Sequence, residues 1–153
     1  MQKIHPMLWF DNQAEEAANF YVSIFKNSKI TNIARNADAK YAPVGTVLTV
    51  SFALDGSEFT ALNGGPLFKF NEAVSLVIDC KDQEEVDYYW DKLLVGGTPS
   101  ACGWLKDKYG MSWQVTPRRL PELLQDKDRA RAARVFQAMM KMVKIDVKTL
   151  EEA

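Results

Sequence analysis

Two side chains in the sequence have the chemistry of a catalytic pair. His5 is the sole histidine, and an imidazole is suited to proton transfer because it titrates near neutral pH. Cys102 precedes Gly103, a residue that lets the backbone approach a ligand closely. A cysteine nucleophile needs a lowered pKa and a base within reach, and His5 is the only imidazole that can serve. We therefore treat His5 and Cys102 as catalytic candidates. The alternative is that His5 is a hydrogen-bonded residue at a strand start and Cys102 packs in a pocket wall.

A second group of residues is suited to holding a small organic molecule. Aromatic rings on strands stack on planar or apolar ligands, and side-chain amides orient such ligands by hydrogen bonds. Strand alternation places Trp113 and Gln114 on opposite faces, so at most one of them faces a ligand. The candidates for ligand contact are Trp9, Asn63, Phe70, Cys102, Trp104 and Gln114.

Length, charge and cysteine content narrow the function classes. The chain has 153 residues, enough for one domain with a sizeable core. Its formal net charge of -1 gives no general attraction to nucleic acid or an anionic membrane. No apolar run approaches the roughly 18 residues that span a bilayer, and the first residues lack an apolar signal segment. Two cysteines are too few for a disulfide framework, so we expect a cytoplasmic protein with reduced thiols.

The first half of the chain, about residues 3–66, has the pattern of a strand, a helix and three further strands. Asn12 and Glu15 are the expected N-cap and capping-box partner of the helix. Asp55-Gly56 between two apolar runs predicts a tight hairpin. The expected elements are a strand over 4–10, a helix over 14–25, and strands over 30–36, 44–54 and 58–62.

The same order of elements begins again in the second half, about residues 70–117. Asp82 and Glu85 form a second capping box ahead of a helical stripe that stops at Gly96-Gly97. A strand over 73–79 precedes this helix, and a hairpin over 104–115 ends the half. An internal repeat is stronger evidence for a fold than any single element, so the sequence predicts two βαβββ modules in one α+β domain, 1–153.

The remaining segment, 118–153, is expected to be a helical extension. Pro117 and Pro121 break the strand pattern, and Asp146 is placed to cap a short last helix. One helical face is expected to carry Ala132, Ala133, Phe136, Met139, Met140 and Val143. Methionine-rich helical faces adapt to partners, so the chain can also be an interaction protein. The alternative is that this face covers the sheet or a dimer interface, and that the arginines and lysines form a solvated surface.

Several segments together resemble the PhnB-like family, whose members are often labelled "3-demethylubiquinone-9 3-methyltransferase". They are Trp9-Phe10-Asp11, Ala14-Glu15-Glu16-Ala17, Asn19-Phe20-Tyr21, the run from Ala61 to Pro66, the run from Cys102 to Asp107, Ser112-Trp113-Gln114-Val115 and Lys144-Ile145-Asp146. The resemblance implies a vicinal-oxygen-chelate (glyoxalase/bleomycin resistance/dioxygenase) fold. In this fold each module curls into a cup-like mixed or antiparallel sheet, and paired modules enclose a cavity. Such proteins are commonly homodimers, so we expect one here. Because the chain lacks the strand, Gly-rich loop, helix and acidic residue of a Rossmann-type cofactor site, we do not expect methyl transfer.

The resemblance also indicates where the ligands of a metal site would lie in this sequence. Metal-dependent members place four His or Glu-type ligands on inward-facing strand positions, where a divalent cation polarises two substrate oxygens. By similarity to glyoxalase I, His5 matches the first ligand and Gln114 the fourth. The second position is near Thr60 or Ala61, and the third is near Ala73 or Ser75. Only an imidazole and a weak amide donor remain.

We therefore expect a cavity that binds a small organic molecule with Gln114 facing inward, Trp113 in the core beneath a helix, no complete metal site and no cofactor. One alternative is a metal-dependent lyase, isomerase or dioxygenase of the same superfamily, with His5 and Gln114 as residual ligands of a divalent cation. The other is the interaction protein described above.

Overall fold

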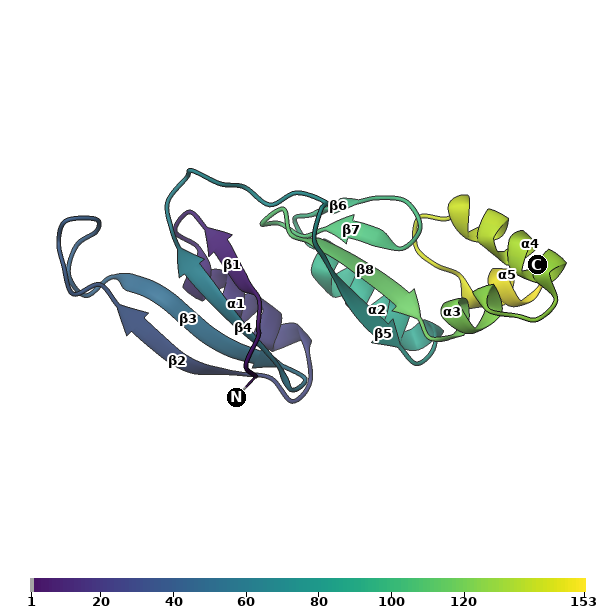
Figure 1. Ribbon diagram of the computed structural model, residues 1–153, viewed down its shortest axis with the longest axis horizontal. Helices are drawn as coiled ribbons and strands as arrows, with labels where there is room; N and C mark the ends of the chain where they lie inside the picture. The colour runs from purple at the N-terminus through teal and green to yellow at the C-terminus, as the bar shows by residue number, and fades with distance from the viewer. Residues whose placement is uncertain (1) are drawn as a thin grey trace. The chain divides into compact units, whose positions relative to one another are not determined.

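The computed structural model describes residues 2–153. It contains two compact units, Met1–Lys69 and Phe70–Ala153. Each unit has a four-stranded sheet with a helix packed on it, and the second unit also carries three C-terminal helices (Figure 1). The predicted α+β class with two βαβββ modules and a helical extension is confirmed.

The first unit is built on one sheet with the strand order β1-β4-β3-β2. Strand β1 pairs parallel to β4, and the other pairs are antiparallel. Asp55 and Gly56 have positive φ angles of 46° and 86°, as a two-residue type I′ turn requires, so the predicted hairpin is confirmed. The elements are β1 (Met7–Phe10), α1 (Ala14–Ile24), β2 (Lys29–Arg35), β3 (Val47–Leu54) and β4 (Ser57–Asn63).

Helix α1 covers one face of this sheet with a stripe of small and aromatic side chains. The stripe consists of Ala14, Ala17, Ala18, Tyr21 and Ile24, all of them buried. Its three alanines let the helix lie close to β3 and β4, where the buried residues Val50, Phe52 and Ala61 face it. Tyr21 stacks on Phe52 with a centroid distance of 6.2 Å. The opposite face of the sheet has no helix of this unit on it.

The start of α1 differs from the prediction. The N-cap is Gln13, and its side chain makes no capping hydrogen bond. Instead the Ala14 N–H donates to Oδ1 of Asn63, at the end of β4, over 2.8 Å. The predicted cap at Asn12 is therefore wrong, because a side chain from 49 residues further along the chain supplies the acceptor.

The second unit repeats this plan, with the strand order β5-β8-β7-β6 and β5 parallel to β8. Asp82 accepts a hydrogen bond from the Glu85 N–H over 3.0 Å, which confirms the predicted N-cap of α2. The Glu85 carboxylate in turn accepts from the Lys81 N–H over 2.9 Å. The elements are β5 (Ser75–Cys80), α2 (Gln83–Leu94), β6 (Thr98–Pro99), β7 (Trp104–Lys106) and β8 (Ser112–Pro117).

The repeat extends to individual backbone contacts. At the end of the first parallel pair, the Gly64 N–H donates to the Phe10 carbonyl over 2.8 Å. At the same place in the second unit, the Arg118 N–H donates to the Cys80 carbonyl over 2.7 Å. The register agrees as well, since Phe10 lies opposite Asn63 and Cys80 lies opposite Pro117. Positions in the two sheets can therefore be matched residue by residue.

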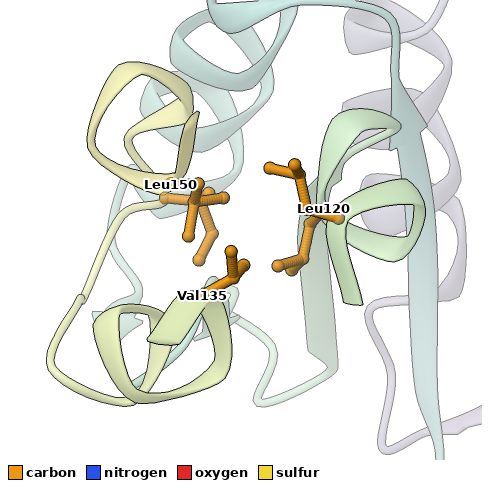
Figure 2. Close-up of a cluster of buried hydrophobic side chains, with 5 residues drawn as sticks. Leu120, Val135 and Leu150 are labelled. Carbon is orange, nitrogen blue, oxygen red and sulfur yellow. The ribbon is translucent and has the colours of Figure 1, made fainter. Parts of the chain in front are cut away.

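The C-terminal extension forms its own small core. Helices α3 (Arg119–Leu124), α4 (Arg129–Met140) and α5 (Val147–Glu151) surround it. Pro121 is tolerated within α3 because it lies in the first turn, where an N–H would have no partner in the helix. Asp146 accepts from the Thr149 N–H over 3.2 Å, which confirms the predicted cap of the last helix. The core consists of Leu120, Leu123, Val135, Ile145 and Leu150 (Figure 2).

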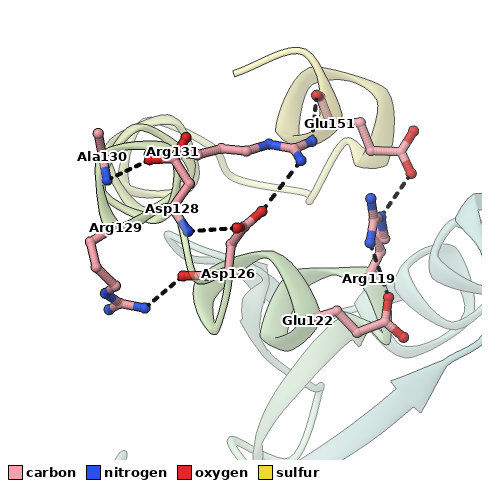
Figure 3. Close-up of polar contacts among 8 residues, drawn as sticks. All are labelled: Arg119, Glu122, Asp126, Asp128, Arg129, Ala130, Arg131 and Glu151. Carbon is pink, nitrogen blue, oxygen red and sulfur yellow. Dashed lines mark hydrogen bonds and ion pairs between the residues drawn. The ribbon is translucent and has the colours of Figure 1, made fainter.

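Ion pairs and hydrogen bonds on the surface of the extension connect the three helices (Figure 3). Arg119 of α3 contacts Glu122 and, over 3.1 Å, Glu151 of α5. Arg131 of α4 contacts Asp126 over 3.3 Å, and its guanidinium also donates to the Glu151 carbonyl. Because exposed pairs each contribute at most about 1 kcal/mol, the apolar core rather than these pairs holds the helices together.

The extension is attached to the rest of the second unit through polar contacts with α2. Gln83 Nε2 donates to the Ile145 carbonyl over 3.0 Å, and Gln83 Oε1 accepts from the Val147 N–H over 2.7 Å. The Lys144 ammonium lies 2.8 Å from the Asp87 carboxylate. These three contacts hold the start of α5 and the segment before it against α2.

More of the apolar surface of α4 is exposed than the sequence pattern predicts. Ala132 and Val135 are buried, whereas Phe136 and Met140 remain 50% and 53% exposed. The single predicted apolar face of α4 is therefore two stripes, of which only one packs on α3 and α5. Within residues 2–153, no helix is long and apolar enough to cross a membrane.

Candidate functional site

Side chains along β8 point alternately to the two faces of its sheet. One face forms the core of the second unit, and the other lies on the side away from α2. Trp113 and Val115 are buried on the side that α2 covers, at 2% and 0% exposure. Gln114 points to the other face and is half-buried. The predicted assignment of these two residues to opposite faces agrees with this structure. For each unit, we call the sheet face opposite its helix α1 or α2 the open face.

Trp113 is fixed from the core side by a buried carboxylate. Asp107 is 3% exposed. Its Oδ2 accepts from Trp113 Nε1 over 2.8 Å, and its Oδ1 accepts from the N–H groups of Tyr109 and Met111. Hydrogen bonds in a buried, low-dielectric site are strong. This network fixes the β7–β8 turn and thereby the strand that presents Gln114.

The open face of the second unit carries a row of three residues across its strands. Gln114 of β8 lies opposite Val77 of β5 on one side and opposite Trp104 of β7 on the other. Val77 is 62% exposed, and Trp104 is half-buried. A side-chain amide thus lies between an apolar residue and an indole, which are groups suited to a ligand with an apolar body and a polar atom.

Gln114 is held in place by a hydrogen bond on the same face. Its Nε2 donates to Ser75 Oγ over 2.9 Å. Ser75 lies two residues before Val77, the register partner of Gln114, so the bond runs diagonally across the parallel pair. Gln114 and Ser75 are the fourth and one of the two third positions predicted for metal ligands.

The first unit has an equivalent pair. His5 Nε2 lies 3.1 Å from Thr60 Oγ1. His5 lies two residues before Met7, the register partner of Thr60, so the geometry matches that of the Ser75–Gln114 pair. The structure therefore brings the predicted ligand positions together in two side-chain pairs, one in each unit.

These four side chains do not fit a catalytic metal ion. They supply one imidazole, two hydroxyls and one neutral amide, whereas divalent cations in proteins are held mainly by imidazoles, carboxylates and thiolates. Each side chain is also hydrogen-bonded to the other member of its pair. Among residues 2–153, no group of three or more His, Cys, Asp or Glu residues is placed to hold a metal.

The other ligand candidates of the first unit have contacts of their own. Trp9 donates from Nε1 to the Gly65 carbonyl over 2.9 Å and packs edge-on against Phe68. A Cβ at Gly64 would lie 2.5 Å from the Trp9 ring, so the indole rests directly on the backbone there. The amide of Asn63 is used inside the unit, since Oδ1 caps α1 and Nδ2 donates to the Val47 carbonyl over 3.1 Å. Both residues are thus built into the framework of the unit.

Asn63 also lines a cleft that the sequence pattern does not reveal. The cleft has a volume of about 800 Å³ and lies at the end of the first sheet, beside the β2–β3 loop. Both polar and apolar residues line it, and the loop is held by a hydrogen bond from Arg35 to the Gly45 carbonyl over 3.0 Å. Its other polar lining residues are Asp11, Asn12, Glu15, Asn36 and Thr46. No local motif connects these segments, because the fold alone brings the loop to the strand ends.

Cys102 lies in a strained loop before β7, packed against the extension. Its φ of 60° is in the left-handed region, which non-glycine residues rarely adopt. The Cys102 N–H donates to the Met142 carbonyl over 2.9 Å, and the thiol lies 3.6 Å from the Met140 sulfur. These partners belong to the second unit, whereas Thr60, the side-chain partner of His5, belongs to the first. The Cys102–His5 pair stays a prediction.

Three further residues of the second unit bear on the site: the ligand candidate Phe70, the second thiol and a lysine. Phe70 is half-buried at the start of the second unit. Cys80 is buried, and this burial, together with nearby carboxylates, raises the pKa of its thiol to about 12. Cys80 is therefore a protonated core residue at neutral pH. Lys106, which sequence reasoning missed, lies on the open face of β7 and forms an ion pair with Glu72.

Comparisons with known proteins agree with this architecture. Residues 2–116 match the model of the family described as 3-demethylubiquinone-9 3-methyltransferase. A search of curated proteins gives no match. Among solved structures, a putative 3-demethylubiquinone-9 3-methyltransferase, PhnB protein, from Bacillus cereus is 38% identical, with a TM-score of 0.69; the match covers 76% of this chain and 99% of that one.

Two further structures share the fold at lower identity. Protein PA1353 from Pseudomonas aeruginosa is 15% identical with a TM-score of 0.60, covering 74% of this chain and 95% of that one. A mutant of the fosfomycin resistance protein FosX from Listeria monocytogenes, in complex with Mn(II) and 1S,2S-dihydroxypropylphosphonic acid, is 16% identical with a TM-score of 0.50, covering 74% of this chain and 90% of that one. The chain belongs to the PhnB-like 3-demethylubiquinone-9 3-methyltransferase family of the vicinal-oxygen-chelate superfamily.

Proposed function

We propose that this protein binds a small organic molecule on the open faces of its sheets, without a metal ion between protein and ligand. The observation that carries the proposal is the pair of matched side-chain contacts, His5–Thr60 and Ser75–Gln114. They occupy the positions that the family resemblance predicts for metal ligands. Their neutral hydroxyls and amide are poor ligands for a divalent cation but good hydrogen-bonding groups for an organic molecule.

The surroundings of Gln114 support a ligand with a planar or apolar body and at least one polar atom. Gln114 uses its Nε2 on Ser75, which leaves Oε1 as an acceptor. Trp104 flanks it across the sheet, and an indole face stacks on flat ring systems. A ligand of this kind donates a hydrogen bond to Gln114 Oε1 and places its aromatic or aliphatic ring against Trp104.

We further propose that the protein works as a homodimer in the cytoplasm. Apolar side chains on the open faces, such as Met7 and Val77 at 56% and 62% exposure, are suited to burial in a cavity or against a second chain. Sedimentation equilibrium gives the mass in solution. A monomer across the micromolar range contradicts the dimer.

A fluorescence screen of aromatic and cofactor-like compounds tests the ligand proposal. Trp104 lies beside Gln114, so a bound ring is expected to change the indole emission. Gln114→Leu is expected to weaken a binding compound roughly tenfold, the loss of one hydrogen bond at about 1.4 kcal/mol. Gln137→Leu makes the same substitution on exposed α4 and is expected to leave binding unchanged. Absence of any binding compound, or binding that requires an added divalent cation, contradicts the proposal.

A further inference from the structure

The open face of the second unit carries a second row of side chains beside the row centred on Gln114. Strand β8 lies between β5 and β7 in the sheet. Ser112 lies on β8 two residues before Gln114, so both project on the same face. Ser112 lies opposite Ser75 of β5 on one side and opposite Lys106 of β7 on the other. Because register partners share a face of the sheet, two hydroxyls and an ammonium group form one row.

The hydroxyl in the middle of this row is a buried polar group. Ser112 is 1% exposed, and its Oγ has no hydrogen-bond partner among residues 2–153. A buried hydroxyl without a partner costs free energy of folding, and such a group in a native protein calls for an explanation. A ligand oxygen that accepts a hydrogen bond from Ser112 supplies the missing partner.

Lys106 already holds a carboxylate. Its ammonium group forms an ion pair with Glu72, which lies before β5. The pair therefore reaches across β8, the strand that carries Ser112. A hydrogen bond from Lys106 lowers the pKa of the Glu72 carboxyl group, so this position favours an ionised carboxylate. The side chains of Lys106 and Glu72 are 43% and 60% exposed. Because exposed ion pairs are weak, a carboxylate on a ligand can replace Glu72.

We propose that Lys106 and Ser112 bind a carboxylate group of the ligand. The subsite rests on the proposed open-face site and names its ligand class, a carboxylic acid with a planar or apolar body. The body lies against Trp104, and the carboxylate lies one row further, about 7 Å along the strand. Glu72 pairs with Lys106 in the free protein and leaves it when the ligand binds.

Two compounds of the same shape test the charge preference on the full-length protein. Naphthylacetate carries a carboxylate, and naphthylacetamide carries a neutral amide in its place. Calorimetry at neutral pH is expected to show the acid binding at least about tenfold more tightly than the amide, the effect of a charge-assisted contact. The difference is expected to shrink as salt rises. Equal affinities, or tighter binding of the amide, overturn the carboxylate subsite.

A lysine variant locates the carboxylate on the protein. Lys106→Met is expected to weaken the acid about tenfold and to leave the amide unchanged, since only the acid uses the ammonium group. Lys92→Met is the matched control, because Lys92 is an exposed residue of α2, the helix on the opposite face of the sheet. It is expected to alter neither affinity. Thermal melts verify that both variants fold. Unchanged affinity for the acid in Lys106→Met, or the same loss in both variants, overturns the proposal.

A glutamate variant tests the exchange of Glu72 for the ligand. Glu72→Gln removes the competing charge and keeps the shape of the side chain. It is expected to tighten the acid about threefold, the size of an exposed ion pair, and to leave the amide unchanged. Glu84→Gln makes the same change on exposed α2 and is expected to alter neither affinity. An unchanged or lower affinity for the acid in Glu72→Gln contradicts the exchange.

A serine variant separates ligand binding from a role in the fold. Ser112 Oγ has no partner within residues 2–153 of the free protein, so Ser112→Ala is expected to keep or raise the melting temperature. The same variant is expected to weaken the acid about tenfold, the loss of a hydrogen bond to a charged group. A lower melting temperature with unchanged affinity for the acid assigns the hydroxyl to the fold and overturns its role in binding.

The carboxylate subsite and the open-face site can fail separately. If the amide binds, Gln114→Leu weakens it and the acid binds no more tightly, then the open-face site stands and the carboxylate subsite is overturned. If neither compound binds at millimolar concentration, the carboxylate subsite is also overturned. The open-face site itself fails only if the wider fluorescence screen finds no binding compound.

Discussion

Gln114 donates its side-chain amide to Ser75 across the parallel strands β5 and β8, with 2.9 Å between the nitrogen and the oxygen. His5, just before β1, and Thr60, on β4, occupy the corresponding places in the first unit and make the equivalent contact. Both modules thus hold a hydrogen-bonded side-chain pair at the positions that the family resemblance predicts for metal ligands. In this chain the positions hold hydrogen-bonding groups instead.

Gly103→Ala is expected to destabilise the second unit by about 2 kcal/mol or more. Gly103 has a φ of 83°, and an added Cβ would lie 2.9 Å from the Val115 carbonyl oxygen and 3.0 Å from Ile145. Urea denaturation measures the effect. Gly110→Ala is the matched control, because its φ is 86° with open space around the Cβ, so only the backbone strain of about 1 kcal/mol applies. Equal losses in the two variants would mean that the contact with Val115 and Ile145 does not matter.

Asp107→Asn is expected to lower the free energy of unfolding by about 1–3 kcal/mol. One carboxylate oxygen serves two backbone N–H groups and the other serves Trp113 Nε1. An amide has one acceptor oxygen, so an NH₂ group would face a donor. Chemical denaturation gives the stability, and near-ultraviolet circular dichroism reports on Trp113. A variant as stable as the wild type would contradict the buried network.

Acid is expected to loosen the extension through Asp87. Hydrogen bonds from Lys144 and Gln83 lower the pKa of this carboxyl group. A lowered folded-state pKa contributes stability above the unfolded value of about 3.9, and this contribution is lost as the pH falls through the folded value. The protection factor of the Val147 amide, whose N–H bonds to Gln83, is expected to fall below about pH 4. Asp87→Asn should remove the part of this pH dependence that Asp87 causes. The same acid response in the variant would assign the effect to other carboxylates.

The two thiols are expected to differ in reactivity. Cys80 is buried, and burial raises its thiol pKa to about 12, so little thiolate forms near neutral pH. Cys102 is half-buried. Alkylation of the native protein at pH 8 should modify at most Cys102, while denatured protein reacts at both positions. Mass spectrometry of digests identifies the site, and native modification of Cys80 would contradict its burial. An unmodified native Cys102 would exclude it as a nucleophile.

Local sequence signals predicted much of the fold. Asp55-Gly56 determined a hairpin because few residue pairs tolerate two positive φ angles. The caps at Asp82 and Asp146 lie within three residues of the N–H groups they serve. The repeat could be recognised in the sequence because each module must bury one face of a helix and one face of a sheet, which gives both modules the same hydrophobic pattern.

Contacts between distant segments were not predictable in the same way. Asn63 caps α1 from another strand, and no residue near Asn12 reveals it. The apolar residues of α4 cover more of the helix circumference than the small core of the extension can bury, so the pattern could not show which stripe is exposed. At the site, the resemblance identified the ligand positions, but only register and side-chain geometry revealed that they form two matched pairs.

Native mass spectrometry tests metal-free binding most directly. The protein is treated with a chelator and then mixed with the strongest binding compound from the fluorescence screen. The account predicts that the complex survives chelation, that Gln114→Leu weakens it roughly tenfold and that Gln137→Leu leaves it unchanged. A complex that forms only when a divalent cation is restored, and that depends on His5, would contradict the account.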